Sequence, residues 1–512
     1  MGKIIAAIDI GTSKIVAYVV NKDSFDKYSV VKKETVFPKE AILRGYIYSL
    51  KIFNEVISEL FQKLKNDKNI QIDKIYVGIG GQSLRTELLK LKSEVENGKV
   101  SHQLIAILKD NARKYEPKLG QNLGIASCEY YVDDQYTSDP EGEKASVLEA
   151  QYQLIVGNPC LKGNLETAFK EINMPVAGYF ISPVATAEAV LTPEEKEFGC
   201  ALVEFGEGIT YVSIYKHKAL KFLITLPIGG FAITSDISSL NVSLEEGEAL
   251  KKKYGNAFSK PTDSGDIPVN GAFRSSRTIK QSELNWAIEN RVNEIVKNVL
   301  KQIQESGYSK EIKAGIVITG GGALLKDLPQ FITEQSGYDV RLAKAKMLID
   351  KVETQLSPAD SCVAGIAMLG KENCGKIIPK SVDPPRPDFN GTEDGNRHQP
   401  GPVVSVNNPV GSVQNPVVSE QRPKEQQPVP EVRPNGDNSN EKKDLITSIT
   451  EKIFNRGETK RGEIKREIIK KEKKSGLEGF IDNFFKDEDF NNDSENEQLV
   501  KETNYYQKEN RK

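Results

Sequence analysis

The 512-residue sequence is poor in the residues that build metal centres and disulfide-linked domains. It contains 3 histidines and 5 cysteines, the cysteines show no CxxC spacing, and no histidine stands at ligand spacing from a cysteine or a carboxylate. A zinc site, a catalytic triad and a secreted disulfide framework are therefore not expected. The cysteine usage suits a reducing cytoplasm.

The sequence also lacks an excess of charge of one sign and a long unbroken apolar run. Lys+Arg of 70 against Asp+Glu of 72 leaves a formal net charge of -2, so we expect no nucleic-acid partner. Asp9 and Lys14 interrupt the apolar start at residues 3–20, and no basic leader precedes it, which argues against a signal peptide or a spanning helix. Ala6 takes the place of the Ser or Thr needed for myristoylation.

The sequence does contain a long region, residues 1–371, with helix-like and strand-like apolar periodicity, which predicts a globular body. Residues 379–434 hold about half of the 24 prolines and almost no aromatic residues, a composition that predicts a flexible linker. Helix-competent stretches follow at 444–454 and 460–474, and an apolar segment at 476–485 lies near the end.

Two hairpin patterns in the globular body repeat the same local design. IIAAIDIGTSKIVAYVV near the N-terminus and CALVEFGEGITYVSIY about 195 positions later both predict strand, glycine turn and strand, with an acidic residue before the turn. Asp9 and Gly11 of the first pattern align with Glu204 and Gly206 of the second. The repeat predicts two lobes that are built alike. A third glycine cluster, in AGIVITGGGALLKDLPQF, lies between a predicted strand and a predicted helix.

Glycine turns of this kind can hold a phosphate group. Without a Cβ atom, the backbone N–H groups can approach phosphate oxygens closely. Thr12 and Ser13 add hydroxyl donors, Lys14 adds a positive charge, and Asp9 could hold magnesium through water. One such turn alone is more often a plain hairpin, but three of them in two similar lobes favour a nucleotide site.

These motifs together resemble those of the actin/Hsp70/sugar-kinase superfamily, and within it the FtsA family of actin-like bacterial cell-division proteins. IDIGTSK, VEFGEGIT and VITGGGA are similar to the first phosphate loop, the second phosphate loop and the adenosine motif. LPIGGFAITSDI (226–237), GEALKKKYG (247–255) and RTIKQSELNWAIENR (277–291) are similar to later segments of that fold. The resemblance covers about residues 3–371.

The resemblance implies an α/β, two-lobed actin-like ATPase fold with an inserted small 1C-type subdomain, followed by a disordered linker and a C-terminal amphipathic helix. The last helix of the body, SCVAGIAMLG at 361–370, is expected to pack on lobe two. The expected parts are lobe one (1A) at 1–81 and 161–198, the 1C-type insertion at 82–160, lobe two (2A) at 199–233 and 313–371, subdomain 2B at 234–312, the linker at 372–475, a membrane-targeting helix at 476–490 and a polar tail at 491–512.

The resemblance also implies ATP and Mg²⁺ as ligands, with Asp9 at the metal. The residues expected at the nucleotide are Asp9, Gly11, Thr12, Ser13, Lys14, Glu204, Gly206, Gly208, Thr210, Glu248, Lys251, Gly320, Gly321 and Gly322. The family usually has Asp-x-Gly-Gly-Gly-Ser/Thr in the second loop, whereas here Glu207 places a carboxylate where a phosphate would lie and Ile209 removes a hydroxyl. We therefore expect weakened nucleotide binding, little or no ATP hydrolysis and no catalytic residues.

The function implied by the resemblance is a scaffold that tethers an FtsZ-type tubulin-like ring protein to the cytoplasmic face of the membrane at the division site. Its expected partners are the ring protein, further copies of itself as a polymer, the lipid surface and later division proteins. Arg277, Arg291 and Lys297, in subdomain 2B, are candidate contacts with the ring protein, although each could equally be an ordinary solvated charge. The alternative is an active phosphotransferase or ATPase on the same fold.

The apolar segment near the end of the chain has helical periodicity. Its large side chains follow the spacing i, i+3, i+4, i+7 and i+8, which places them on one face of a helix. Such a face on a flexible tether predicts an interfacial membrane anchor, and docking on the protein itself or on a partner groove is the alternative. The residues of this face are Leu477, Phe480, Ile481, Phe484 and Phe485.

Overall fold

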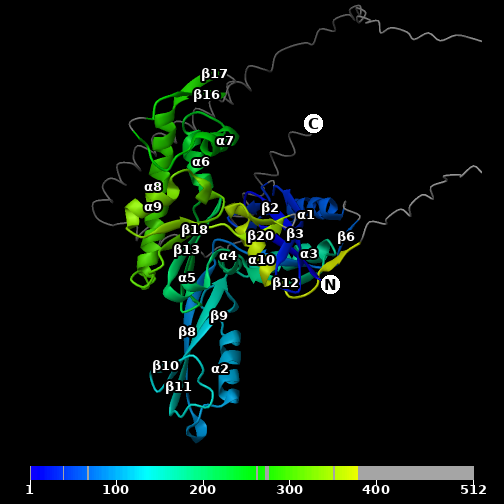
Figure 1. Ribbon diagram of the computed structural model, residues 1–512, viewed down its shortest axis with the longest axis vertical. Coiled ribbons are helices and arrows are strands. Elements are labelled where there is room, and N and C mark those ends of the chain that lie inside the picture. The colour runs from blue at the N-terminus through cyan, green and yellow to red at the C-terminus, as the bar shows by residue number, and fades with distance from the viewer. Residues whose placement is uncertain are drawn as a thin grey trace, which may run out of the picture. The chain divides into compact units, whose positions relative to one another are not determined.

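The computed structural model describes residues 2–38, 40–65, 69–260, 263–270, 276–349 and 352–378. These residues belong to the first of two units, Met1–Asn390, and the second unit is Gly391–Lys512. Figure 1 shows the described part as helices packed around β-sheets. The predicted linker, amphipathic helix and polar tail lie outside the described residues, apart from the first few positions after 371.

The first sheet has seven strands in the order β12-β7-β1-β2-β3-β20-β21. Ile4 to Ile8 of the central strand β1 are all buried, as expected for a strand that is covered on both faces. The strands are β1 (Lys3–Ile10), β2 (Ile15–Lys22), β3 (Tyr28–Val36), β7 (Ile75–Ile79), β12 (Val176–Ile181), β20 (Lys346–Ile349) and β21 (Val352–Gln355). The helices packed around this sheet, which together with it form the first lobe, are α1 (Leu50–Lys65), α3 (Cys160–Glu171), α4 (Ser182–Val190) and α10 (Ser361–Leu369).

The second sheet has nine strands in the order β10-β9-β11-β8-β15-β14-β13-β18-β19. Its strands are β8 (Arg85–Glu94), β9 (Gln121–Val132), β10 (Gln135–Thr137), β11 (Val147–Gly157), β13 (Cys200–Phe205), β14 (Thr210–Lys216), β15 (Ala219–Leu226), β18 (Ile316–Thr319) and β19 (Val340–Leu342). Strands β13 to β15, β18 and β19 with their helices form the second lobe. Alternate side chains of β13 enter different cores, since Leu202 joins the core of the first lobe and Val203 joins a second core around α8 (Gln281–Glu305).

The two predicted hairpins form, and they form in the same register. In the first, Ile10 pairs with Ile15 and the turn spans residues 11–14. In the second, Phe205 pairs with Thr210 and the turn spans residues 206–209. Apolar alternation and glycine turns are local signals, so the sequence alone was sufficient to predict both hairpins.

The insertion expected at 82–160 contains β8, β9, β10, β11 and the helix α2 (His102–Lys114), and α2 contacts β8, β9 and β11 (Figure 1). A separate apolar core, which includes Leu108, Leu148 and Tyr152, lies within it. In sequence, the insertion is flanked on both sides by segments of the first lobe. Its strand β8 nevertheless pairs with β15 of the second lobe, through Arg85 and Ile224.

The region expected as subdomain 2B holds α7 (Leu244–Tyr254), the hairpin β16 (Asp266–Asn270) and β17 (Ser276–Lys280), and the long helix α8. Helix α6 (Gly230–Ser238) begins a few residues before the expected boundary at 234 and contacts both α7 and α8. Apolar side chains of α8 recur at helical spacing on one face and are buried.

The prediction that the last helix packs on lobe two is wrong. Helix α10 lies against β1, β2 and β7 of the first sheet and against α4 (Figure 1). Strands β20 and β21 also join the first sheet, through Leu348 opposite Ser29, so the last part of the expected segment 313–371 returns to the first lobe. The reason is packing: Gly365 lets α10 approach the backbone of Ala185 in α4 so closely that both faces of this apolar helix are buried.

The remaining described elements are short connections and edge strands. They are β4 (Ile42–Leu43), β5 (Tyr46–Ile47), β6 (Ile70–Ile72), β22 (Gly375–Ile377), α5 (Pro193–Phe198), α9 (Leu328–Ser336) and the 3-10 turns η1 (Glu96–Gly98), η2 (Gly322–Leu324) and η3 (Pro358–Asp360). Among the described helices, none combines the length and the hydropathy needed to cross a membrane.

Candidate nucleotide-binding site

The three glycine segments that the sequence singled out converge in the structure. A Cβ atom at Gly208 would lie 3.1 Å from Oγ1 of Thr12, so the two hairpin loops touch. Gly320 has a φ of +90°, and a Cβ atom there would lie 2.4 Å from the carbonyl oxygen of Phe205. The adenosine-type motif therefore packs against the base of the second loop, although more than a hundred residues separate the two in the chain.

The two hairpin turns are closed by the same hydrogen bond. Gly11 N–H donates to the carbonyl of Lys14 at 3.1 Å, and Gly206 N–H donates to the carbonyl of Ile209 at 2.9 Å. A Cβ atom on either glycine would stand within 3 Å of that same carbonyl oxygen, so a side chain would open the turn. The requirement for glycine at both positions is thus a property of the turn itself.

Two partly buried carboxylates stand at equivalent positions of the hairpins, Asp9 opposite Val16 and Glu204 opposite Tyr211. Burial raises the pKa of Asp9 above its usual range. Burial and the neighbouring charge of Asp9 together raise the pKa of Glu204 to about 8. Glu204 Oε2 is buried and has no hydrogen-bond partner within the described part of the chain. Such an oxygen is costly unless a cation or a polar group meets it.

This pair of carboxylates fits a hydrated divalent cation. No group of three or more His, Cys, Asp or Glu side chains among the described residues is placed to hold a metal ion. Magnesium, however, is commonly bound by one or two carboxylates and completes its shell with waters and substrate phosphates. The unpartnered oxygen of Glu204 beside Asp9 is the feature that such an ion would satisfy.

The second hairpin loop is held against the start of α6. Gly230 N–H donates to the carbonyl of Gly206 at 2.9 Å, and Phe231 N–H donates to the carbonyl of Glu207 at 2.8 Å. The pKa of Glu207 is raised overall. Burial and the charge of Glu248 raise it by more than the nearby lysines lower it. The carboxyl group that departs from the family pattern is therefore a half-buried part of the loop.

Glu248 and Lys251, expected at the nucleotide, do lie beside this loop. Lys251 Nζ is 2.6 Å from Glu248 Oε2 and donates to the carbonyl of Gly230 at 2.8 Å. The charge of Lys251 is thus already compensated inside the protein.

Thr210 has a supporting role, since its buried hydroxyl donates to the carbonyl of Ile228 at 2.8 Å. Ser13 is exposed at the tip of the first loop.

Lys14 has an internal partner that the sequence did not reveal. Its Nζ lies 2.7 Å from Oδ1 of Asp360, which stands at the start of α10. Lys33 Nζ lies 2.5 Å from Oδ2 of the same carboxylate, and the hydroxyl of Tyr18 donates to it at 3.2 Å. The separation of 346 positions between Lys14 and Asp360 leaves no local signal from which this contact could be found.

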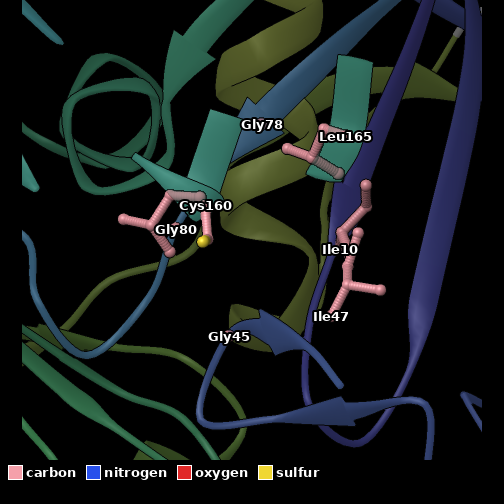
Figure 2. A pocket seen from close by; sticks show the side chains of 8 residues that line it. Ile10, Gly45, Ile47, Gly78, Gly80, Cys160 and Leu165 are labelled. Atoms are coloured by element: carbon pink, nitrogen blue, oxygen red, sulfur yellow. The ribbon is translucent and has the colours of Figure 1, made fainter. Parts of the chain in front are cut away.

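Tyr211 is a second group that the sequence did not single out. Its hydroxyl accepts a hydrogen bond from Gly81 N–H at 2.7 Å, which joins the second hairpin to the loop after β7. Beside this loop and the first hairpin is a small cavity of about 10 Å³, room for about one water molecule (Figure 2). Its lining residues are Ile10, Gly45, Ile47, Gly78, Gly80, Cys160, Leu161 and Leu165.

The three candidate partner contacts lie on neighbouring elements. Arg291 and Lys297 are on α8, and Arg277 is on β17. Arg291 already has a partner within its own lobe, because its guanidinium donates two hydrogen bonds to Asp236, at 2.7 and 3.0 Å. Lys297 is exposed. Arg277 Nε and Nη2 are buried and have no partner among the residues that the structure describes.

The two matched lobes, with paired glycine hairpins and an adenosine-type motif, define an actin-like ATPase fold. Among solved structures, the PilM-PilN type IV pilus biogenesis complex has a chain that matches with a TM-score of 0.50 at 13% identity, over 71% of this chain and 97% of that one. The family model described as "Cell division protein FtsA" matches residues 201–365. FtsA of Porphyromonas gingivalis is 28% identical over 69% of this chain and 74% of its own length. FtsA of Pseudomonas aeruginosa is 26% identical over 74% of this chain and 92% of its own length. The chain is thus similar to FtsA cell-division proteins over about 70% of its length, and the family model matches within that part.

Proposed function

We propose that this protein is an actin-like scaffold that binds ATP with Mg²⁺ and tethers an FtsZ-type tubulin-like ring protein to the cytoplasmic face of the membrane. One observation carries the nucleotide site: both hairpin loops and the Gly320–Gly322 motif converge beside the two partly buried carboxylates Asp9 and Glu204. Similarity to FtsA cell-division proteins supports the role at the division ring.

In this proposal each part of the site has a physical role. Backbone N–H groups of the two loops approach the phosphates, and Lys14 supplies a positive charge. Asp9 and Glu204 hold the magnesium ion, which would screen the charge of the phosphates when bound. Gly320 and Gly322 pack closely against Phe205, which holds this motif at the base of the second loop, where the nucleoside would bind.

Turnover of ATP is expected to be slow. Glu207 brings a carboxyl group into the second phosphate loop, where an ionised form repels a phosphate. Glu207→Gly should therefore tighten ATP binding, as measured by isothermal titration calorimetry. Rapid hydrolysis by the natural sequence that is lost in Asp9→Ala would favour the alternative, an active ATPase or phosphotransferase.

Attachment to the membrane is assigned to the apolar segment 476–485, and it rests on the sequence pattern. The lysines just upstream, Lys470, Lys471, Lys473 and Lys474, would be attracted to an anionic leaflet, each by about 1 kcal/mol at most. Self-association would multiply the anchors and prolong attachment.

Sedimentation with anionic liposomes tests this proposal, with and without the ring protein and with and without Mg-ATP. The wild-type chain should carry the ring protein into the pellet. Phe480→Glu with Phe484→Glu should leave both in the supernatant. Asn483→Glu with Asn491→Glu is the matched control, because it adds the same charge away from the apolar face. Equal pelleting of the two double variants would reject the anchor.

A further inference from the structure

Asp360 is a buried carboxylate with two positively charged partners. Its side chain is 2% exposed, and Lys14 and Lys33 bind one carboxylate oxygen each, at 2.7 and 2.5 Å. Burial disfavours the ionised form of Asp360, but the hydrogen bonds and charges of the two lysines lower its pKa below the usual range. One cation would neutralise this carboxylate, so the second is in excess.

The two lysines differ in where they come from. Lys14 is the last residue of the first hairpin turn, whereas Lys33 lies on β3 and is held over the ring of Tyr18, 5.6 Å from its centroid. Lys33 is 43% exposed and Lys14 is 26% exposed, so both amines can reach solvent. Lys14 therefore belongs to the first phosphate loop, whereas Lys33 belongs to the sheet beside that loop.

Asp360 is also tied to the other end of the site. Gly320 N–H donates to the carbonyl of Pro358 at 3.2 Å, and the hydroxyls of Thr319 and Ser361 are 2.9 Å apart. The segment that carries Asp360 is thus bonded to the adenosine-type motif. A change in the partners of Asp360 would therefore affect both the first hairpin, through Lys14, and the Gly320 motif.

We propose that Lys33 acts as a reserve counter-ion that frees Lys14 for an anionic phosphate. When a phosphate enters between the loops, Lys14 moves to it, and Lys33 keeps Asp360 paired. This rests on the proposed ATP site for the identity of the anion. Lys33 is then a positioning residue, which acts on the phosphate through Asp360 and Lys14 without touching it.

The physical reason is the cost of an unpaired buried charge. Without Lys33, departure of Lys14 would leave the buried Asp360 carboxylate with no counter-ion and only the hydroxyl of Tyr18 as a hydrogen-bond donor, which is strongly unfavourable. Lys33→Met should therefore hold Lys14 on Asp360 and weaken binding of Mg-ATP by about tenfold or more. Asp360→Asn in the same chain removes the negative charge that holds Lys14. The double variant should therefore recover most of the lost affinity.

Two measurements on the full-length protein test this exchange. Calorimetric titration gives the affinity for Mg-ATP, and mass spectrometry after a brief pulse of acetic anhydride gives the acetylation rate of the Lys14 amine without nucleotide. Lys33→Met should slow the acetylation of Lys14 severalfold, and adding Asp360→Asn should make it faster than in the wild type. Lys32→Met is the matched control, because Lys32 lies on the same strand but donates to the carbonyl of Lys63 at 2.7 Å.

The outcomes separate the exchange from the ATP site. Weaker ATP binding and slower acetylation in Lys33→Met, both reversed by Asp360→Asn and absent in Lys32→Met, support the exchange. An unchanged acetylation rate in Lys33→Met overturns it, as does a loss of affinity that Asp360→Asn does not restore. If the wild type binds no ATP, the proposed nucleotide site fails, and the acetylation rates alone then decide the exchange.

Discussion

The contact between α10 and α4 predicts a large effect from a single methyl group at Gly365. A Cβ atom there would lie 1.7 Å from the carbonyl oxygen and 2.3 Å from the carbonyl carbon of Ala185. Ordinary contacts of a Cβ atom begin at about 3.4 Å, so the two helices would have to separate by about 1.7 Å. The obstacle is backbone, which cannot turn aside as a side chain can.

Two opposing terms set the size of this effect. Alanine is favoured over glycine within a helix by about 1 kcal/mol. Overpacking of a tight core costs about 1–3 kcal/mol and occasionally more, and a backbone clash of this depth belongs at the upper end. Gly365→Ala should therefore lower the free energy of unfolding by about 2 kcal/mol or more.

The same substitution in another helix provides the control. Gly163 lies in α3, and a Cβ atom there would meet nothing within 4 Å. Gly163→Ala should thus stabilise the protein by up to about 1 kcal/mol. Urea denaturation followed by circular dichroism should shift the midpoint down for Gly365→Ala and up for Gly163→Ala. A Gly365→Ala midpoint at or above that of the wild type would refute the packing of α10 against α4.

Three further predictions concern single buried groups. Because the pKa of Glu204 is raised from 4.5 to about 8, the folded state keeps a proton that the unfolded chain has released, so stability should fall as pH rises through this window. Glu204→Gln should flatten that fall in urea titrations across the same pH range, and an equal slope in both proteins would contradict it. Tyr211→Phe should cost about 1 kcal/mol in unfolding free energy, because the N–H of Gly81 loses its partner. The buried amine of Lys221 forms an ion pair with Glu129. Lys221→Met should destabilise the protein more than the double variant with Glu129→Gln, because the single change leaves the Glu129 carboxylate without its counter-ion, and a thermal-shift comparison of the two decides this.

Much of the site could be predicted from the sequence because its parts are local. Each hairpin needs a glycine where a Cβ atom would strike the carbonyl three residues on, and Gly11 and Gly206 carry that requirement in the sequence. The apolar periodicity of α8 likewise depends only on residues within one helix. The nucleotide and membrane assignments remain predictions, whereas the hairpins and the actin-like fold are confirmed.

Other features could not be predicted because they depend on which surfaces meet. The segment at 346–369 has no local sign of its partner, and only packing places it on the first lobe. The insertion is likewise hydrogen-bonded to the second lobe, although its neighbours in sequence belong to the first. Thr225 Oγ1 donates to the carbonyl of Leu84 at 2.8 Å, and Ser127 Oγ donates to the carbonyl of Leu220 at 2.8 Å.

The sequence by itself determined the elements, the two repeated turns and the acidic residue that precedes each of them, because backbone sterics and side-chain periodicity act over a few residues. Only the tertiary structure decided that Asp360 would stand between Lys14 and Lys33, and that Gly208 would meet Thr12. Such contacts join residues hundreds of positions apart. Their energy comes from burial and charge compensation, which exist only once the chain has folded.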